Sequence, residues 1–187
     1  HLTGKRSVGI YLLRPDGTIG AVVIDIDMKE APDQGLSKAR EIMAVLEAMG
    51  FGPWLERSRG KGWHIWVFFR EPVPAFKAKA LAAHVRDRVD LPAAEIFPKQ
   101  STLDGLAYGN YINLPYLGGK PLADGRRAMW NGDQAISLDA FLEEVPDTRA
   151  TEKDLDAALV AAGLPLVPVE PVQRKRQDFT PLIGANL

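Results

Sequence analysis

Apolar and polar residues alternate along several short runs of the chain, and between them lie longer stretches with apolar residues three or four positions apart. The first pattern predicts β-strands and the second predicts amphipathic helices. Pro15, Asp16 and Gly17 form turns readily, so the first two strands are expected to make a hairpin. The predicted strands cover residues 8–13, 18–27, 54–58, 64–69, 94–97, 111–114 and 128–130, and the predicted helices cover residues 32–50, 74–89, 137–144 and 151–163.

This order of elements predicts an α/β (α+β) sandwich, with helices packed on a mixed or antiparallel sheet. Residues 64–69 are apolar on both faces after His64, which is typical of a strand at the centre of a sheet. Thr151 and Asp154 have the spacing of a capping box and predict the start of the last helix. The pattern of strands and helices is similar to that of the RNA-recognition-type (RRM-like) fold.

The composition limits the possible partners. The 187 residues suit one ordinary domain with a small addition, and 23 Lys and Arg against 24 Asp and Glu give no global attraction to nucleic acid. The absence of cysteine excludes disulfides and cysteine-bound zinc and agrees with a cytoplasmic location.

We expect no membrane segment, a core at residues 1–135, a helical appendage at 136–164 and a proline-rich extended tail at 165–187. The chain starts at His1, so further domains or partner proteins outside it are expected.

Two carboxylates stand out in the second predicted strand. Asp25 and Asp27 are two positions apart, so both point to one face of the strand, while the other face is apolar. Acids on such a strand are costly to bury unless a cation compensates them, which favours a metal site. The alternative is that Asp27 caps a turn and Asp25 pairs with a basic residue.

A glycine-rich turn precedes the central strand. It contains Ser58, Arg59, Gly60 and Lys61, and His64 follows. Glycine allows backbone N–H groups to approach a ligand, and the cations and the imidazole can bind phosphate oxygens, so the turn is interpreted as a polyphosphate site. It is not a Walker loop, because the spacing differs and a strand follows in place of a helix. The alternative is a solvated turn with incidental cations.

Glu95, on a short predicted strand, is the candidate for a third acid, and its alternative role is that of a surface residue. Asp90 and Asp104 are the other acids that could fill this place. Further polar side chains expected near the same sheet edge are Lys99, Gln100, Asn110 and Asn113.

The segments DID, SRGKGWHIWVFF, EIFPKQ and GNYINLPY, in this order, resemble the catalytic domain of the archaeo-eukaryotic primase superfamily. Within it the chain looks most like bacterial primase-polymerases of mobile-element conflict systems and of loci beside CRISPR adaptation genes. The resemblance covers about residues 1–130. It places Asp25 and Asp27 in a DxD-type first motif, and it places Ser58, Gly60 and His64 in an SxGxxH-type second motif, a loose pattern of which SRGKGWH is one variant. Glu95 stands where the family usually has an aspartate.

The resemblance implies a template-dependent nucleotidyltransferase, a primase-polymerase, with initiation of primers left open. Asp25, Asp27 and Glu95 would be the catalytic acids and would hold two Mg²⁺ or Mn²⁺ ions. The residues from Ser58 to His64 would bind a nucleoside triphosphate, and the other partners would be template DNA, or RNA, and a primer strand.

Two other functions remain open at this point. The chain could be a non-catalytic RRM-like module that binds single-stranded nucleic acid, with Trp63, Trp66 and Tyr111 as stacking platforms. A DxD-dependent glycosyltransferase is the third hypothesis, although no residue pattern indicates a sugar site. Burial of Trp66 and convergence of the acids would favour the enzyme.

Overall fold

The computed structural model describes residues 1–28, 31–60 and 62–168. Most predicted elements are present within these ranges, and a short strand after β7 was not predicted. In chain order the elements are β1 (Gly9–Tyr11), β2 (Thr18–Ile26), α1 (Pro32–Ala48), β3 (Trp54–Arg57), β4 (Trp63–Pro74), α2 (Ala75–Arg88), β5 (Glu95–Phe97), β6 (Tyr111–Asn113), β7 (Ala128–Asn131), β8 (Gln134–Ala135), α3 (Leu138–Thr148) and α4 (Glu152–Ala161).

Six strands form one antiparallel sheet in the order β5-β2-β4-β3-β7-β8. β4 lies between β2 and β3, so the prediction of a central strand is confirmed. β1 and β6 form a separate two-stranded antiparallel sheet. The predicted α+β class, with helices packed on an antiparallel sheet, is therefore confirmed.

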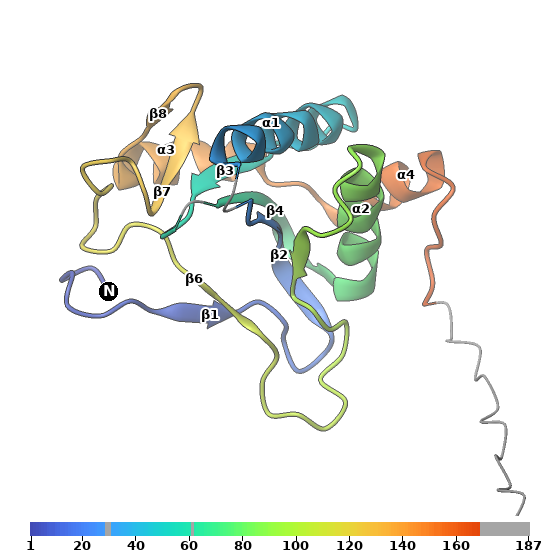
Figure 1. Cartoon of the computed structure of the whole chain (residues 1–187). Helices are drawn as coiled ribbons and strands as arrows, with labels where there is room; N and C mark the ends of the chain where they lie inside the picture. The colour runs from blue at the N-terminus through green and yellow to red at the C-terminus, as the bar shows by residue number, and fades with distance from the viewer. Residues whose placement is uncertain (29–30, 61, 169–187) are drawn as a thin grey trace, which may run out of the picture.

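Two hydrophobic cores lie on opposite faces of the six-stranded sheet. Helices α1 and α2 cover one face, where Ile24 and Ile65 belong to the larger core. Val23 and Trp66 point the other way, into a smaller core that is closed by α3 and by the β1–β6 sheet. Figure 1 shows α1 above the sheet, α2 to its right and the β1–β6 pair below it.

The predicted hairpin between β1 and β2 forms only at its turn. Gly17 donates to the carbonyl of Arg14 at 3.0 Å, but the pairing reduces to one isolated bridge between Leu13 and Ile19. β1 pairs with β6 instead, which contradicts the prediction. The reason is burial, because Leu12 on the β1 side and Ile112 on β6 both enter the smaller core.

The last two helices pack on the sheet. Thr151 and Asp154 make both hydrogen bonds of the predicted capping box, which is confirmed. Leu155 and Leu159 of α4 are fully buried in the larger core, on the α2 side of the sheet. α3 continues to Thr148, beyond the predicted end at residue 144.

No helix in the described part of the chain is long and apolar enough to cross a membrane. Most of the predicted tail, residues 169–187, lies outside the described residues.

Candidate active site

Four titratable side chains form one row across the sheet. The strand register pairs Asp25 of β2 with Glu95 of β5 on one side and with His64 of β4 on the other. The same register pairs His64 with Glu56 of β3. Directly paired residues on adjacent strands lie about 4.5–5.5 Å apart and point to the same face. The row therefore runs Glu95, Asp25, His64, Glu56, on the face opposite α1 and α2.

Glu56 is a buried acid whose carboxylate contacts the imidazole of His64. The Glu56 side chain is only 3% exposed, and its Oε2 accepts a hydrogen bond from the Trp66 indole at 2.7 Å. The same oxygen lies 2.9 Å from His64 Nδ1, so Nδ1 is the donor to this carboxylate. His64 Nε2 is 3.5 Å from Asp25 Oδ1. The imidazole thus bridges a buried acid and a half-buried one.

The pKa of His64 is raised above its ordinary value. Burial lowers it, because burial disfavours the imidazolium, but the hydrogen bond and charge of Glu56 outweigh this effect. The charge of Asp25 raises the pKa further. Glu56 and Asp25 therefore both favour the positively charged form of the ring, which lies between the acids of the row.

Asp25, Asp27 and Glu95 line one pocket of about 310 Å³. Burial raises the pKa of Asp25, and although the charge of His64 lowers it, the neighbouring carboxylates of Asp27 and Glu95 raise it again. A divalent cation would relieve both the burial cost and the repulsion. Three carboxylates are also the ligand type that Mg²⁺ and Mn²⁺ prefer, so these residues fit the expected metal.

This acidic pocket is not yet arranged as a complete ligand set. Within the described ranges, no three His, Asp or Glu side chains are grouped closely enough to hold an ion. Glu95 accepts a hydrogen bond from Lys99 Nζ at 2.8 Å. Binding of an ion by Glu95 would compete with its ion pair to Lys99, in which the Glu95 side chain is 53% exposed.

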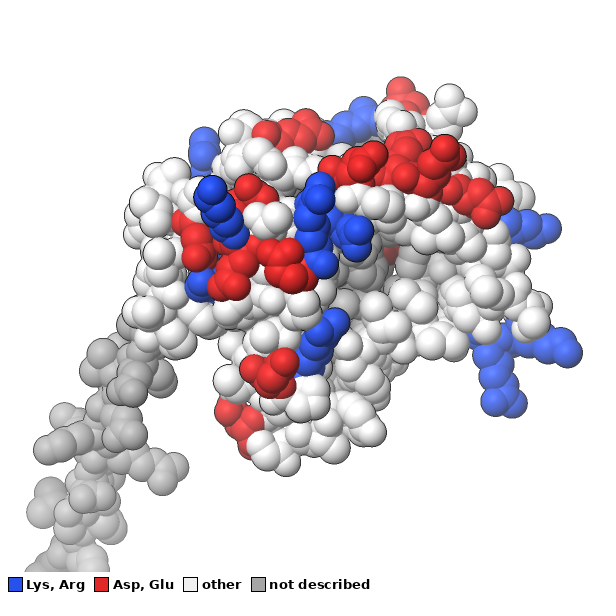
Figure 2. Space-filling view, turned by 180° about the vertical axis from the view of Figure 1, so that it is seen from behind, with Lys and Arg blue, Asp and Glu red and all other residues white. Residues whose placement is uncertain are grey.

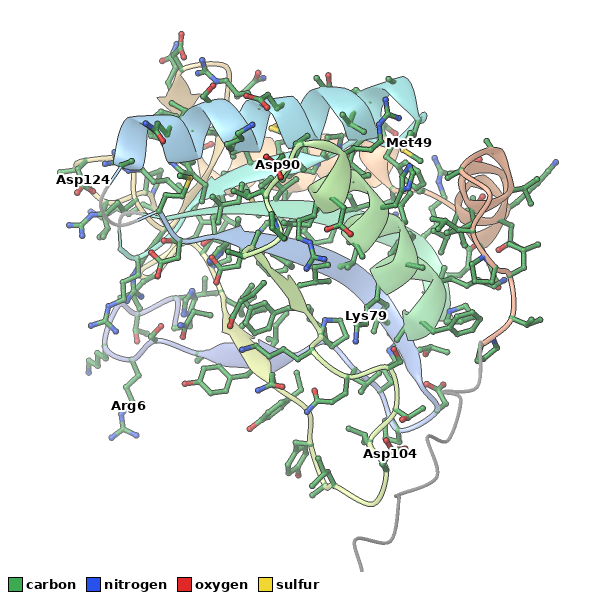
Figure 3. All side chains as sticks on the ribbon, turned by 45° about the vertical axis from the view of Figure 1, so that its right-hand side comes forward. Arg6, Met49, Lys79, Asp90, Asp104 and Asp124 are labelled. Atoms are coloured by element: carbon green, nitrogen blue, oxygen red, sulfur yellow. The ribbon has the colours of Figure 1, made fainter. Side chains whose placement is uncertain are left out.

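The two other acids considered for the third position lie elsewhere. Asp90 follows α2, and Asp104 lies in the loop between β5 and β6, as Figure 3 shows. The Asp104 carboxylate accepts a hydrogen bond from Thr102 at 2.6 Å. Neither acid lines the acidic pocket.

A second pocket, of about 140 Å³, lies on the other side of His64. Ser58 and Arg59 of the glycine-rich turn line it, together with His64, as the polyphosphate interpretation requires. Lys61, the other predicted cation, lies outside the described residues. The remaining residues of this pocket, which we call the cationic pocket, are Glu56, Asn113, Leu114 and Arg127.

Gly62 explains why the turn lies beside the acids. A Cβ atom at Gly62 would be 2.7 Å from the carbonyl oxygen of Ile26 and 3.5 Å from Cα of Asp27. Only glycine permits this approach of the turn to the end of β2. Gly60 differs, because a Cβ there would meet no protein atom within 4 Å.

Sequence reasoning missed two residues of the site. Glu56 could have been found by extending the register of the β3–β4 hairpin, since it lies eight residues before His64 around the turn. Arg127 is a buried cation, 8% exposed, whose guanidinium donates to Ser7. It lies more than sixty residues after the turn in the sequence, and no local pattern marks it.

The aromatic residues of the binding-module hypothesis divide into two groups. Trp63 and Trp66 are 6% and 2% exposed, so neither can serve as a stacking platform. Tyr111 is 57% exposed and remains accessible.

The whole site lies within one recognised domain. Residues 1–153 match the family described as the archaeo-eukaryotic primase domain of TOTE conflict systems, and this range includes every residue of both pockets. No curated protein is similar enough to the chain to be matched with it. The family expected from the four sequence segments is confirmed, and the chain belongs to the archaeo-eukaryotic primase domain family of TOTE conflict systems.

Proposed function

We propose that this primase-type domain is a template-dependent nucleotidyltransferase, a primase-polymerase that adds nucleotides to a DNA or RNA strand. The observation that carries the proposal is the row across the sheet, in which His64 separates an acidic pocket from a cationic one. Nucleotidyl transfer needs this pairing, because the same triphosphate must contact metal-holding carboxylates and charge-neutralising donors.

Each pocket has a defined part in the proposed reaction. Asp25, Asp27 and Glu95 would hold two Mg²⁺ or Mn²⁺ ions, which would supply Lewis-acid activation of the 3′-hydroxyl and neutralise charge on the phosphates. Arg59 and Arg127 would bind the phosphate oxygens in the cationic pocket through charge-assisted hydrogen bonds.

His64 would contact both groups. Its Nε2 is 3.5 Å from Asp25, at the limit of a hydrogen bond, so Nε2 can donate to a phosphate oxygen that enters between the pockets. Glu56 orients the ring for this contact and favours its charged form.

The proposal is tested by thermal melting together with primer extension. Wild-type protein should extend a primed template, and Mn²⁺ with a nucleoside triphosphate at about a hundred times its Kd should raise the melting temperature by about 5–10 °C. The double variant Asp25→Asn/Asp27→Asn should lose both responses, while its melting temperature without ligand should not fall, because the substitution relieves repulsion. Equal ligand responses of the two proteins would contradict the assignment of these acids.

Gly60 and Gly62 provide a matched pair for the glycine-rich turn. Gly62→Ala should lower the melting temperature, because the added Cβ would clash with the backbone of β2. Gly60→Ala should leave folding unchanged, because its surroundings are open, but should raise the KM for nucleotide about tenfold if phosphates contact this backbone. An unchanged KM for Gly60→Ala, measured by steady-state kinetics, would remove this glycine from the phosphate site.

A further inference from the structure

Three exposed tyrosines form one aromatic surface on the β1–β6 sheet and the adjoining loop. Tyr11 and Tyr111 are paired directly in the register of the two strands, so both point to the same face. The ring of Tyr108 stacks on Tyr11 at 4.9 Å, and Tyr111 meets Tyr11 edge-on at 6.3 Å. The exposed fractions are 49% for Tyr11, 67% for Tyr108 and 57% for Tyr111. We call these three residues the tyrosine platform.

The Tyr111 ring of the platform is supported by the backbone beneath it. A Cβ atom at Gly9 would lie 2.4 Å from Cδ2 of Tyr111, so the Tyr111 ring rests directly on the Gly9 backbone. Ile112, between the platform and Asn113, is buried in the smaller core and anchors the strand. Rings that are already ordered lose little entropy when a partner stacks on them.

The charge around the platform favours an anionic partner. Residues 1–14 and 105–123 carry four cations and no acid, and the nearest acids along the chain are Asp16, Asp104 and Asp124, just outside these ranges. Arg6 projects from the segment before β1 away from the body of the molecule (Figure 3). Figure 2 shows, at the end that carries this segment, a group of lysine and arginine side chains surrounded by uncharged surface. The four cations, all exposed, are Lys5, Arg6, Arg14 and Lys120.

The platform is also connected to the candidate active site by one strand. β6 runs from Tyr111 of the platform to Asn113, which lines the cationic pocket. Residues two positions apart on a strand are roughly 6–7 Å apart. A chain of nucleotides stacked on the platform would therefore lie next to the site where a nucleotide is added.

We propose that the tyrosine platform binds the single-stranded part of the template by base stacking, with the surrounding cations contacting its phosphates. This inference rests on the proposed function, and it adds a place for the strand outside both pockets. Aromatic rings stack with any base, and the cations follow the backbone, which is how proteins bind single strands without sequence preference. The alternative occupant of the platform is a second copy of this chain, which is tested below. Any other protein partner would be expected to present acids to these cations.

The test measures binding of a fluorescent single-stranded oligothymidylate by anisotropy at two salt concentrations. Tyr108→Leu should weaken binding about tenfold, because leucine keeps the apolar bulk but loses the stacking face. Tyr108→Phe should bind like wild type. Leu106→Ala is the matched control, since Leu106 is 57% exposed in the same loop and has no aromatic ring, and its affinity should not change. The variant Lys5→Ala/Arg6→Ala should weaken binding mainly at low salt.

Two outcomes would overturn the inference. One is an unchanged affinity in both Tyr108→Leu and Tyr11→Leu. The other is a change in oligomeric state of the Tyr108→Leu variant by light scattering, which would make the platform an interface between copies of this chain.

The test also separates this inference from the proposed function. If wild type extends primers and the tyrosine variants keep their KM for template, the function stands and the platform fails. If no extension occurs but Tyr108→Leu still loses oligonucleotide binding, the platform stands and the catalytic proposal fails.

Discussion

Glu95→Gln is expected to reduce primer extension by about a hundredfold or more while the fold survives. A catalytic metal site contributes several kcal/mol to transition-state stabilisation, and about 1.4 kcal/mol corresponds to a factor of ten in rate. Glutamine keeps the size of the side chain but removes the negative charge that would neutralise an ion. The ion pair of Glu95 with Lys99 is exposed, so the melting temperature should change little.

The structure supplies two matched controls for this variant. Asp90 and Asp104 do not line the acidic pocket, so Asp90→Asn and Asp104→Asn should stay within a few-fold of wild type in the same primer-extension assay. The register of β2 with β5 is the reason to favour Glu95, since it places this acid directly opposite Asp25. A dead Asp104→Asn variant beside an active Glu95→Gln variant would assign the third acid to the β5–β6 loop.

Glu56→Gln is expected to have the largest effect on stability among single substitutions in the row. One carboxylate oxygen of Glu56 accepts hydrogen bonds from both His64 and Trp66, and a glutamine carbonyl in its place would lose the negative charge that strengthens these bonds. Hydrogen bonds to charged groups contribute about 1.5–3 kcal/mol, and a domain of this size loses about 2–4 °C per kcal/mol. The melting temperature should therefore fall by about 3–12 °C, as measured by calorimetry.

Glu41→Gln is the control for the Glu56 variant. Glu41 is a surface glutamate paired with Lys38 at 2.8 Å, and its loss should cost less than about 1 kcal/mol. Glu56 also acts through His64, so the KM for nucleotide should rise in Glu56→Gln and remain unchanged in Glu41→Gln. Similar melting temperatures for the two variants would show that the buried network does not stabilise the fold.

Local sequence patterns were sufficient to predict most of the strands and helices and part of the candidate active site. The alternation from residue 22 to residue 27 predicts one buried face and one acidic face, and both Asp25 and Asp27 line the acidic pocket. The spacing of Thr151 and Asp154 predicts a helix start, because both hydrogen bonds of the capping box are made within four residues. These predictions depend only on the periods of strands and helices, which the chain sets over a few residues.

The pairing of β1 was not predictable in this way. The turn at residues 14–17 forms as its sequence indicates, but β1 leaves β2 after one bridge and pairs with β6 about a hundred residues later. Burial of Leu12 and Ile112 against the sheet decides between these two partners. Because the free energy of this burial comes from a core assembled from distant segments, no short stretch of the sequence predicts the pairing.

By itself, the sequence determined the two motifs, the faces of their strands and the helices that cover one side of the sheet. Only the tertiary structure decided how the motifs meet. Strand register places Glu56 beneath His64, and the backbone contact of Gly62 with β2 brings the glycine-rich turn to the acids. Arg127, in the turn directly before β7, enters the cationic pocket from a distant part of the chain for the same reason. Residues far apart in the chain become neighbours when sheet pairing and burial of apolar surface are satisfied together, and this condition is a property of the whole fold.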